Sequence, residues 1–143
     1  MEGVKFAGKV TSNDWIYEPR RGEPDYWKKR MLSLCREIIF LNMIDSPFVV
    51  RMEEVIKTKS NYYTVLEFCN GGSLQDFLDL HGRFPEPFAI KCLAQIVGGC
   101  TALYEKNIMH RDLKLDNILI HFPQYDLLSE SQLREMDLNT CDF

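Results

Sequence analysis

The sequence of 143 residues lacks the cysteine patterns that mark metal sites and disulfide frameworks. Its five cysteines are odd in number and scattered, with no CxxC pair, which indicates neither a zinc site nor a set of disulfides. We therefore expect buried or partly buried thiols in a reducing compartment. The five positions are Cys35, Cys69, Cys92, Cys100 and Cys141.

The sequence also has little excess charge and no long uninterrupted apolar run. A net charge of −4 argues against bulk electrostatic binding to nucleic acid or to an anionic membrane. The N-terminal stretch MEGVKFAGKV has no apolar signal-peptide core. Lys91, Gln95 and two glycines interrupt the most apolar stretch, residues 88–103, so we expect no membrane insertion. The expected location is the cytoplasm, with the nucleus as an alternative.

A group of basic residues follows the first predicted strand. It could act as a nuclear signal or as a docking site for phosphopeptides. Acidic residues are interleaved with it, however, which favours a solvated loop and helix face. The group consists of Arg20, Arg21, Lys28, Lys29 and Arg30.

The apolar spacing predicts the order strand, helix, two strands and then mainly helix. Residues 4–10 alternate as a strand, and residues 48–56 and 62–68 are two β-rich runs joined as a hairpin. A helix between the first strand and this hairpin should begin after a capping Asp25 and end before Asp45. Its buried stripe is expected to be Met31, Leu34, Cys35, Ile38 and Leu41.

The second half of the sequence is mainly helical. After the turn NGG at 70–72 we expect a short helix, and a long helix that opens at Pro85. Ser129 and Gln132 are spaced as a capping box in a polar segment that looks inserted. The expected buried stripe of the long helix is Ala89, Leu93, Ile96, Val97, Cys100, Leu103 and Tyr104. This order predicts an α+β fold in two lobes, divided as 1–69 and 70–143.

The segment IMHRDLKLDNILI, residues 108–120, holds a dense set of polar groups between short apolar flanks. We expect residues 108–109 and 117–120 to pair as small strands, which would make the intervening loop rigid. Asp112 could then accept a hydroxyl proton, Lys114 could neutralise phosphate oxygens and Asn117 could ligate magnesium. His110 and Arg111 would orient the loop. The alternative without a catalytic role is an ordinary polar turn.

The string HRDLKLDN resembles the catalytic loop of the eukaryotic protein kinase family, and a lysine at the position of Lys114 is typical of its serine/threonine members. The general character is similar to calcium/calmodulin-type or Unc-51-like autophagy kinases. The resemblance implies that Lys9 in FAGK contacts the ATP phosphates and pairs with Glu37. Ala7 would then cover the adenine. Lys5 is the competing lysine.

The stretch YTVLEFCNGGSL resembles the hinge between the two kinase lobes. The resemblance places Leu66 at the gatekeeper position, and the backbone groups of Glu67 and Cys69 against adenine. It also implies ATP and Mg²⁺ as cofactors, with Asn117 as a metal ligand. Asp142, in the C-terminal CDF, is the second candidate ligand, although its distance from Asn117 along the chain is longer than the family usually shows.

The resemblance implies a serine/threonine protein kinase that acts on protein hydroxyls. Residues 1–143 contain no glycine-rich loop before Lys9 and nothing that resembles an activation segment, so we expect them to be a partial kinase domain, inactive alone. A non-catalytic kinase-like binding module is the alternative. A small-molecule phosphotransferase of related fold is a third reading. The arginine of the HRD string and the GGSL turn argue against that third reading.

Overall fold

The computed structural model describes residues 3–20 and 23–143, and Arg21 of the predicted basic group lies outside them. The chain divides into two compact units, one ending at Glu67 and the other beginning at Phe68. The division falls two residues before the lobe boundary expected from the sequence. Each unit is described by itself.

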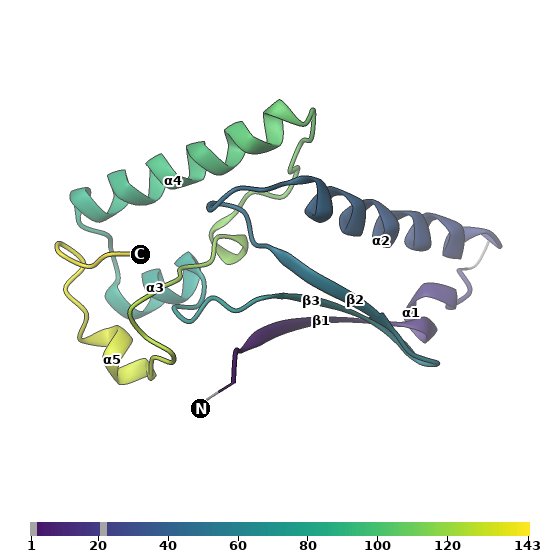
Figure 1. The fold of residues 1–143 in the computed structure, drawn as a ribbon, viewed down its shortest axis with the longest axis horizontal. Helices are drawn as coiled ribbons and strands as arrows, with labels where there is room; N and C mark the ends of the chain where they lie inside the picture. Colours follow the sequence, from purple (N-terminus) through teal and green to yellow (C-terminus); the bar gives the residue numbers. More distant parts are fainter. Residues whose placement is uncertain (1–2, 21–22) are drawn as a thin grey trace. The chain divides into compact units, whose positions relative to one another are not determined.

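The first unit is built on a three-stranded antiparallel sheet (Figure 1). Strand β1, Phe6–Ser12, and strand β2, Met52–Lys57, pair on either side of β3, Asn61–Glu67. The two later strands form the predicted hairpin, whereas β1 starts and ends two residues later than the alternation of residues 4–10 suggested. The sheet therefore aligns Lys9 with Thr64, which is 2% exposed.

Helix α2, Tyr26–Met43, packs against β2 of this sheet. Met31, Leu34, Ile38 and Leu41 lie on its buried or half-buried face, as their spacing predicted. Cys35 is exposed, which corrects its place in the predicted stripe. Asp25 occupies the N-cap position but makes no side-chain capping bond there, because its backbone (φ −97°, ψ 15°) lies outside the extended region that a capping side chain requires.

A short helix that the sequence did not predict, α1 (Asn13–Tyr17), follows β1 directly. The Ser12 hydroxyl caps it by accepting from the Trp15 amide at 3.1 Å. The Asn13 side chain donates to the Lys59 carbonyl in the β2–β3 turn at 2.7 Å, and Ile16 is fully buried. Part of the long connection between Lys9 and Glu37 is therefore ordered on the sheet.

Arg30 is packed among aromatic rings, unlike the solvated side chain expected for the basic group. Its guanidinium lies 4.7 Å from the ring centroids of both Trp15 and Tyr26, and it donates to the Trp15 carbonyl and to Glu18. The side chain is 16% exposed. Arg20, Lys28 and Lys29 have exposed side chains, as predicted.

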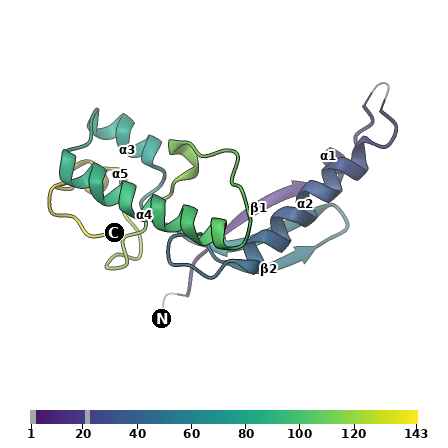
Figure 2. The same ribbon diagram turned by 90° about the horizontal axis from the view of Figure 1, so that it is seen from above.

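The second unit contains four helical segments (Figure 2). Helix α3, Leu74–His81, ends at Gly82, whose φ of +75° favours glycine. Helix α4, Glu86–Glu105, is followed by the 3₁₀ turn η1, Leu115–Asn117. Helix α5, Glu130–Arg134, contacts α3 and begins with the predicted capping box of Ser129 and Gln132.

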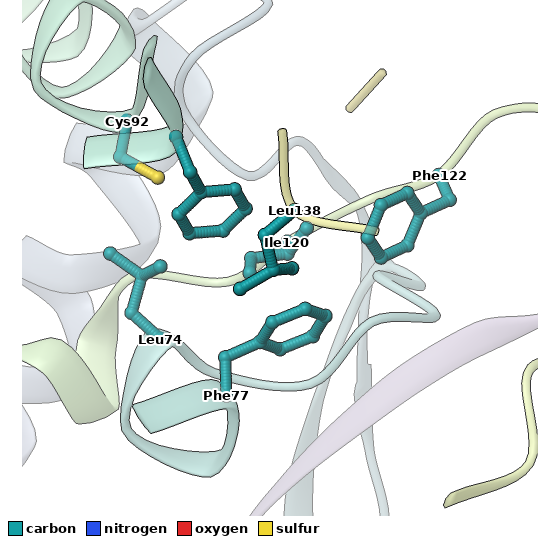
Figure 3. Close-up of a cluster of buried hydrophobic side chains, with 7 residues drawn as sticks. Leu74, Phe77, Cys92, Ile120, Phe122 and Leu138 are labelled. Atoms are coloured by element: carbon teal, nitrogen blue, oxygen red, sulfur yellow. The ribbon is translucent and has the colours of Figure 1, made fainter. Parts of the chain in front are cut away.

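The core of the second unit is a cluster of buried aromatic and aliphatic side chains (Figure 3). The Phe77 ring lies 6.1 Å from Phe88 and 6.0 Å from Phe122, centroid to centroid, and all three are at most 1% exposed. Phe143 packs on Phe88 at 5.0 Å. The segment after residues 108–120 therefore contributes to this core. The other buried members are Leu74, Cys92, Ile120 and Leu138.

The predicted buried stripe of α4 is mostly wrong. Ile96 and Leu103 are half-buried, and Ile96 packs against the core, but the other members are exposed: Ala89, Leu93, Val97, Cys100 and Tyr104. Phe88, Cys92 and Gly99 are the buried positions, whereas Leu93 is 60% and Tyr104 80% exposed. Apolar residues surround this helix, so spacing alone cannot identify the face that packs. Contact with Phe77 and Phe143 selects the Phe88 face.

Helix α4 is also long and apolar enough, by length and composition alone, to cross a membrane. The interruptions at Lys91 and Gln95 were expected to prevent this. Only 17% of the apolar window is buried inside the structure, and its buried positions Phe88 and Cys92 belong to the core of the second unit.

Candidate catalytic site

The backbone around HRDLKLDN differs from the predicted pair of small strands. Residues 108–109 are not in a strand, and Leu119 forms its bridge with Ser73. The Ile120 amide donates to the Gly72 carbonyl at 2.8 Å, and the Gly71 amide donates to the Ile120 carbonyl at 2.9 Å. The prediction is wrong because the partner of 118–120 is the turn before α3, which is distant in sequence.

The loop brings together the three residues to which the sequence assigned chemistry. The Asn117 amide nitrogen donates to the Asp112 carboxylate and to the Asp112 carbonyl, both at 2.8 Å. The Lys114 ammonium lies 4.0 Å from the same carboxylate. The side chains of Asp112 and Lys114 are 70% and 53% exposed. An acid and a cation are thus presented to solvent from one fixed loop.

His110 and Arg111 shape the backbone of this loop. The Asp112 amide donates to Nδ1 of His110 at 3.3 Å. Arg111 has a φ of +65°, a left-handed conformation that is costly for a residue with a side chain and that recurs at functional sites. Both observations fit the orienting role predicted for this dipeptide.

In the first unit, β1 and α2 bring Lys9 and Glu37 together. Their ammonium and carboxylate lie 2.5 Å apart, although 28 residues separate them in the chain. The side chains are 53% and 38% exposed. The competing Lys5 precedes β1, and its exposed side chain lies outside this pair.

The remaining predicted nucleotide contacts lie at the end of β3 and after it. Ala7 on β1 pairs in register with Leu66 on β3, and both are half-buried. The Glu67 carboxylate accepts from the Arg51 amide at 2.9 Å, and the Glu67 amide donates to the Arg51 carbonyl at 2.9 Å. Cys69 is half-buried in the second unit.

Asp142 is bound to α4. Its carboxylate lies 2.6 Å from the Lys91 ammonium, and this ion pair holds the pKa of Asp142 below its usual value. Lys91 also donates to the Cys141 carbonyl at 3.0 Å, and Gln95 donates to the Phe143 carbonyl at 2.8 Å. The predicted metal ligand therefore has a structural partner. It also lines a hollow of about 500 Å³ formed by residues of the 124–142 segment.

Magnesium is bound through oxygen atoms, so a candidate ligand needs an oxygen atom that is available. Both bonds made by the Asn117 side chain use its nitrogen, so neither occupies the carboxamide oxygen, a hard donor of the kind that Mg²⁺ prefers. Asn117 therefore fits the role of a magnesium ligand. The carboxylate of Asp142 is engaged by Lys91. Within 3–20 and 23–143, no three His, Cys, Asp or Glu residues are grouped to hold a metal ion.

Asn70 is a residue of this region that the sequence reasoning missed. Its side chain is 7% exposed and bonds to the backbone of Phe122 and Tyr125. The only signal in the sequence was an asparagine before two glycines, which reads as a turn. Its long-range partners cannot be read from local spacing.

The protein kinase domain family matches residues 19–143 of the sequence. That match covers the HRDLKLDN segment, the hinge-like stretch and α2, and the chain belongs to the protein kinase family. Its fold is accordingly that of a protein kinase domain, of which it contains a small antiparallel sheet and helices of the second lobe. The match begins after Ala7 and Lys9, so the placement of Lys9 depends on its pairing with Glu37.

The relatives are serine/threonine protein kinases. The chain is 39% identical over 136 residues to the serine/threonine-protein kinase AtPK1/AtPK6 of Arabidopsis thaliana, covering 94% of the chain and 27% of that protein. It is 40% identical over 88 residues to the A. thaliana serine/threonine-protein kinase ATG1a, covering 62% of the chain and 14% of the relative.

A third relative is calcium-dependent protein kinase 5 of Plasmodium falciparum, which is 42% identical over 86 residues, covering 60% of the chain and 15% of the relative. These relatives confirm the resemblance to serine/threonine kinases that include autophagy and calcium-dependent types. The chain spans about a quarter or less of the length of the curated relatives described here.

Proposed function

We propose that the protein carrying this chain is an ATP- and Mg²⁺-dependent kinase that phosphorylates serine and threonine residues of proteins. The observation that carries the proposal is the catalytic loop, in which Asn117 fixes the Asp112 carboxylate and Lys114 stands 4.0 Å from it. Phosphoryl transfer depends mostly on positioning and on neutralising charge, and this loop supplies groups for both.

The proposed reaction uses the two charged groups of the loop in different ways. The Asp112 carboxylate accepts the proton of the substrate hydroxyl, whose oxygen then bonds to the γ-phosphorus of ATP. The bond between that phosphorus and the β–γ bridging oxygen breaks, and ADP leaves. Lys114 neutralises charge on the transferred group. The exposed positions of both side chains support access by a substrate protein.

Lys9 would hold the α- and β-phosphates of ATP, and Glu37 would orient it. Their 2.5 Å pairing supports this role, because it holds the ammonium beside Glu37 and leaves further N–H donors for phosphate oxygens. A bound magnesium ion would supply positive charge that neutralises the ATP phosphates. The Asn117 carboxamide oxygen would hold it. The Lys91 pairing of Asp142 supports a structural role there.

The hinge contacts belong to the same proposal. Leu66 would stand behind the adenine, and Ala7 would cover its face. The Glu67 carbonyl and the backbone of Cys69 would form its hydrogen bonds. A residue of any type can make a main-chain hydrogen bond, so the side chains at these positions do not determine the specificity for adenine. The backbone geometry does. We further propose a cytoplasmic protein, with a nuclear location as the alternative, that binds proteins and neither nucleic acid nor a lipid bilayer.

A phosphate-transfer assay tests the function. The product of the complete reading frame is incubated with γ-labelled ATP, Mg²⁺ and casein as a generic acceptor, and the labelled amino acids are identified. We expect phosphoserine and phosphothreonine. Nucleotide binding without any transfer to protein would instead identify a non-catalytic kinase-like module.

Two lysines of the first unit test the assignment of the phosphate contact. We expect Lys9→Met to lower the transfer rate by about a hundredfold or more, because it removes a preorganised charge from the phosphates. Lys5→Met is the matched control and should retain nearly the wild-type rate. A reversed order would assign the phosphate contact to Lys5.

A further inference from the structure

The side chain of Asn70 uses all of its hydrogen-bonding groups on one distant segment. Its amide nitrogen donates to the Phe122 carbonyl at 2.9 Å and to the Tyr125 carbonyl at 2.5 Å. Its carboxamide oxygen accepts from the Phe122 amide at 2.8 Å. The side chain is only 7% exposed, so water cannot readily replace these bonds. Asn70 therefore fixes the backbone at 122–125.

Backbone bonds continue the attachment from Asn70 toward the catalytic loop. Gly71 and Gly72 pair with Ile120, and the Leu74 amide donates to the Ile118 carbonyl at 2.8 Å. The two segments approach so closely that a Cβ on Gly71 would lie 2.9 Å from the Ile120 carbonyl oxygen. Residues 118–122 are consequently held along residues 70–74.

The held segment begins next to a catalytic-loop residue. Ile118 follows Asn117, whose side chain binds both the carbonyl and the carboxylate of Asp112 at 2.8 Å. A hydrogen-bonded path thus runs from Asn70 through the 118–122 backbone to Asn117 and Asp112. At its other end, Asn70 directly follows Cys69, one of the proposed adenine contacts.

We propose that Asn70 is a positioning residue for the phosphate transfer proposed above, on which this inference rests. It touches no reacting atom. It holds the 118–122 segment in the position from which Asn117 orients Asp112, and it links that segment to the residue that would contact adenine. Loosening Asn70 should therefore disturb both the catalytic loop and ATP binding, far from the bonds that are removed.

The first test is Asn70→Ala in the product of the complete reading frame, assayed below its unfolding midpoint with ATP and casein. The change removes the bonds from Asn70 to the Phe122 amide and to the Phe122 and Tyr125 carbonyls, and of these groups the Phe122 carbonyl keeps the Tyr125 amide as a donor at 3.1 Å. We therefore expect kcat to fall about tenfold and KM for ATP to rise about threefold. Asn139→Ala is the matched control, since the amide of Asn139 bonds to Asp137 on the surface. Unchanged kcat and KM with a lower unfolding midpoint would make Asn70 merely structural and overturn the proposal.

Hydrogen exchange supplies a readout that does not need activity. In Asn70→Ala we expect faster exchange at 110–117 as well as at 122–125. Faster exchange confined to 122–125 would overturn the proposed link. If the alanine variant does not fold, the wild-type protein decides. Adding a non-hydrolysable ATP analogue with Mg²⁺ should slow exchange in both segments together, and slowing at 110–117 alone contradicts the coupling.

These outcomes separate this inference from the proposed function. Absence of phosphate transfer by the wild-type protein refutes the kinase proposal, while the exchange comparison between Asn70→Ala and wild type still tests the link. An active wild type with an unaffected Asn70→Ala variant refutes the positioning role alone.

Discussion

The two units present their functional residues from very different supports. In the described part of the first unit, three residues are buried: Ile16, Leu34 and Thr64. The second unit has a cluster of seven buried side chains that includes three phenylalanines. The Lys9–Glu37 pair therefore stands on a thin sheet, whereas the catalytic loop is anchored next to Ile120, a member of the larger core.

This difference teaches where rigidity is built in. The second unit fixes Asp112 through buried packing and a continuous set of hydrogen bonds. The first unit holds Lys9 by one exposed ion pair, of a kind that contributes little to stability. Substitutions should consequently affect stability mostly in the second unit.

The largest expected effect is that of Phe77→Ala. The Phe77 ring is fully buried between Phe88 and Phe122, so its removal should cost about 3–5 kcal/mol in the free energy of unfolding. Chemical denaturation measures this cost. Tyr104→Ala, at a side chain that is 80% exposed, is the control and should change stability by about 0.5 kcal/mol or less. Equal effects would remove the distinction between core and surface.

Glycine substitutions compare the two units directly. Gly71→Ala should destabilise by about 1–3 kcal/mol, because its Cβ would lie 2.8 Å from the Phe122 ring and 2.9 Å from a carbonyl oxygen. Gly8→Ala in β1 meets no atom within 4 Å and should be neutral or slightly stabilising. Thermal unfolding of both variants checks this, and a harmless Gly71→Ala would contradict the close approach.

The two capping boxes provide a smaller comparison. Ser73→Ala should cost about 1 kcal/mol in the free energy of unfolding, and Ser129→Ala about 0.5 kcal/mol, because Ser73 is 9% exposed and Ser129 lies in solvent. The bonds from Ser73 hold the pKa of Asp76 below its usual value of 3.8. The cap is therefore fully stabilising above that value and weakens as pH falls through the lower folded pKa.

Denaturation of wild type and Ser73→Ala at pH 7 and near pH 3 measures this linkage. The stability difference between the two proteins should shrink at the lower pH. A difference that grows on acidification would contradict the sign derived for Asp76.

The smallest expected effect on stability is that of Lys9→Met. The pair with Glu37 is exposed on both sides, so its loss should change the free energy of unfolding by less than about 1 kcal/mol. Measured beside the large loss of transfer rate expected for the same variant, this result would assign the pair to function. A loss of several kcal/mol would make it a structural pair.

Local patterns predicted the elements that depend on nearby residues. The helix from residue 26, the hairpin of β2 and β3 and the Ser129 capping box follow from spacing that the structure retains. Short α1 was missed, because its support is the distant Lys59 carbonyl. Most of the predicted buried face of α4 was wrong, because apolar residues lie all round this helix and tertiary packing decides among them.

The candidate site shows the same division between local and distant information. The spacing within HRDLKLDN predicted that Asp112, Lys114 and Asn117 would act together, and one loop does bring them together. Their support was predicted incorrectly as two paired strands. The actual support comes from residues 70–74, about 45 positions earlier in the chain, and from Asn70, whose role requires knowledge of what lies beside it.

The two aspartates of the catalytic loop give the most direct test of the kinase account. The rate of γ-phosphate transfer from ATP to casein is measured for Asp112→Asn and for Asp116→Asn, both exposed residues within five positions. Loss of the proton acceptor should lower the rate of the Asp112 variant by about a hundredfold or more, whereas the Asp116 variant should stay close to wild type. Equal rates for the two variants would contradict the assignment of Asp112 and, with it, the proposed chemistry.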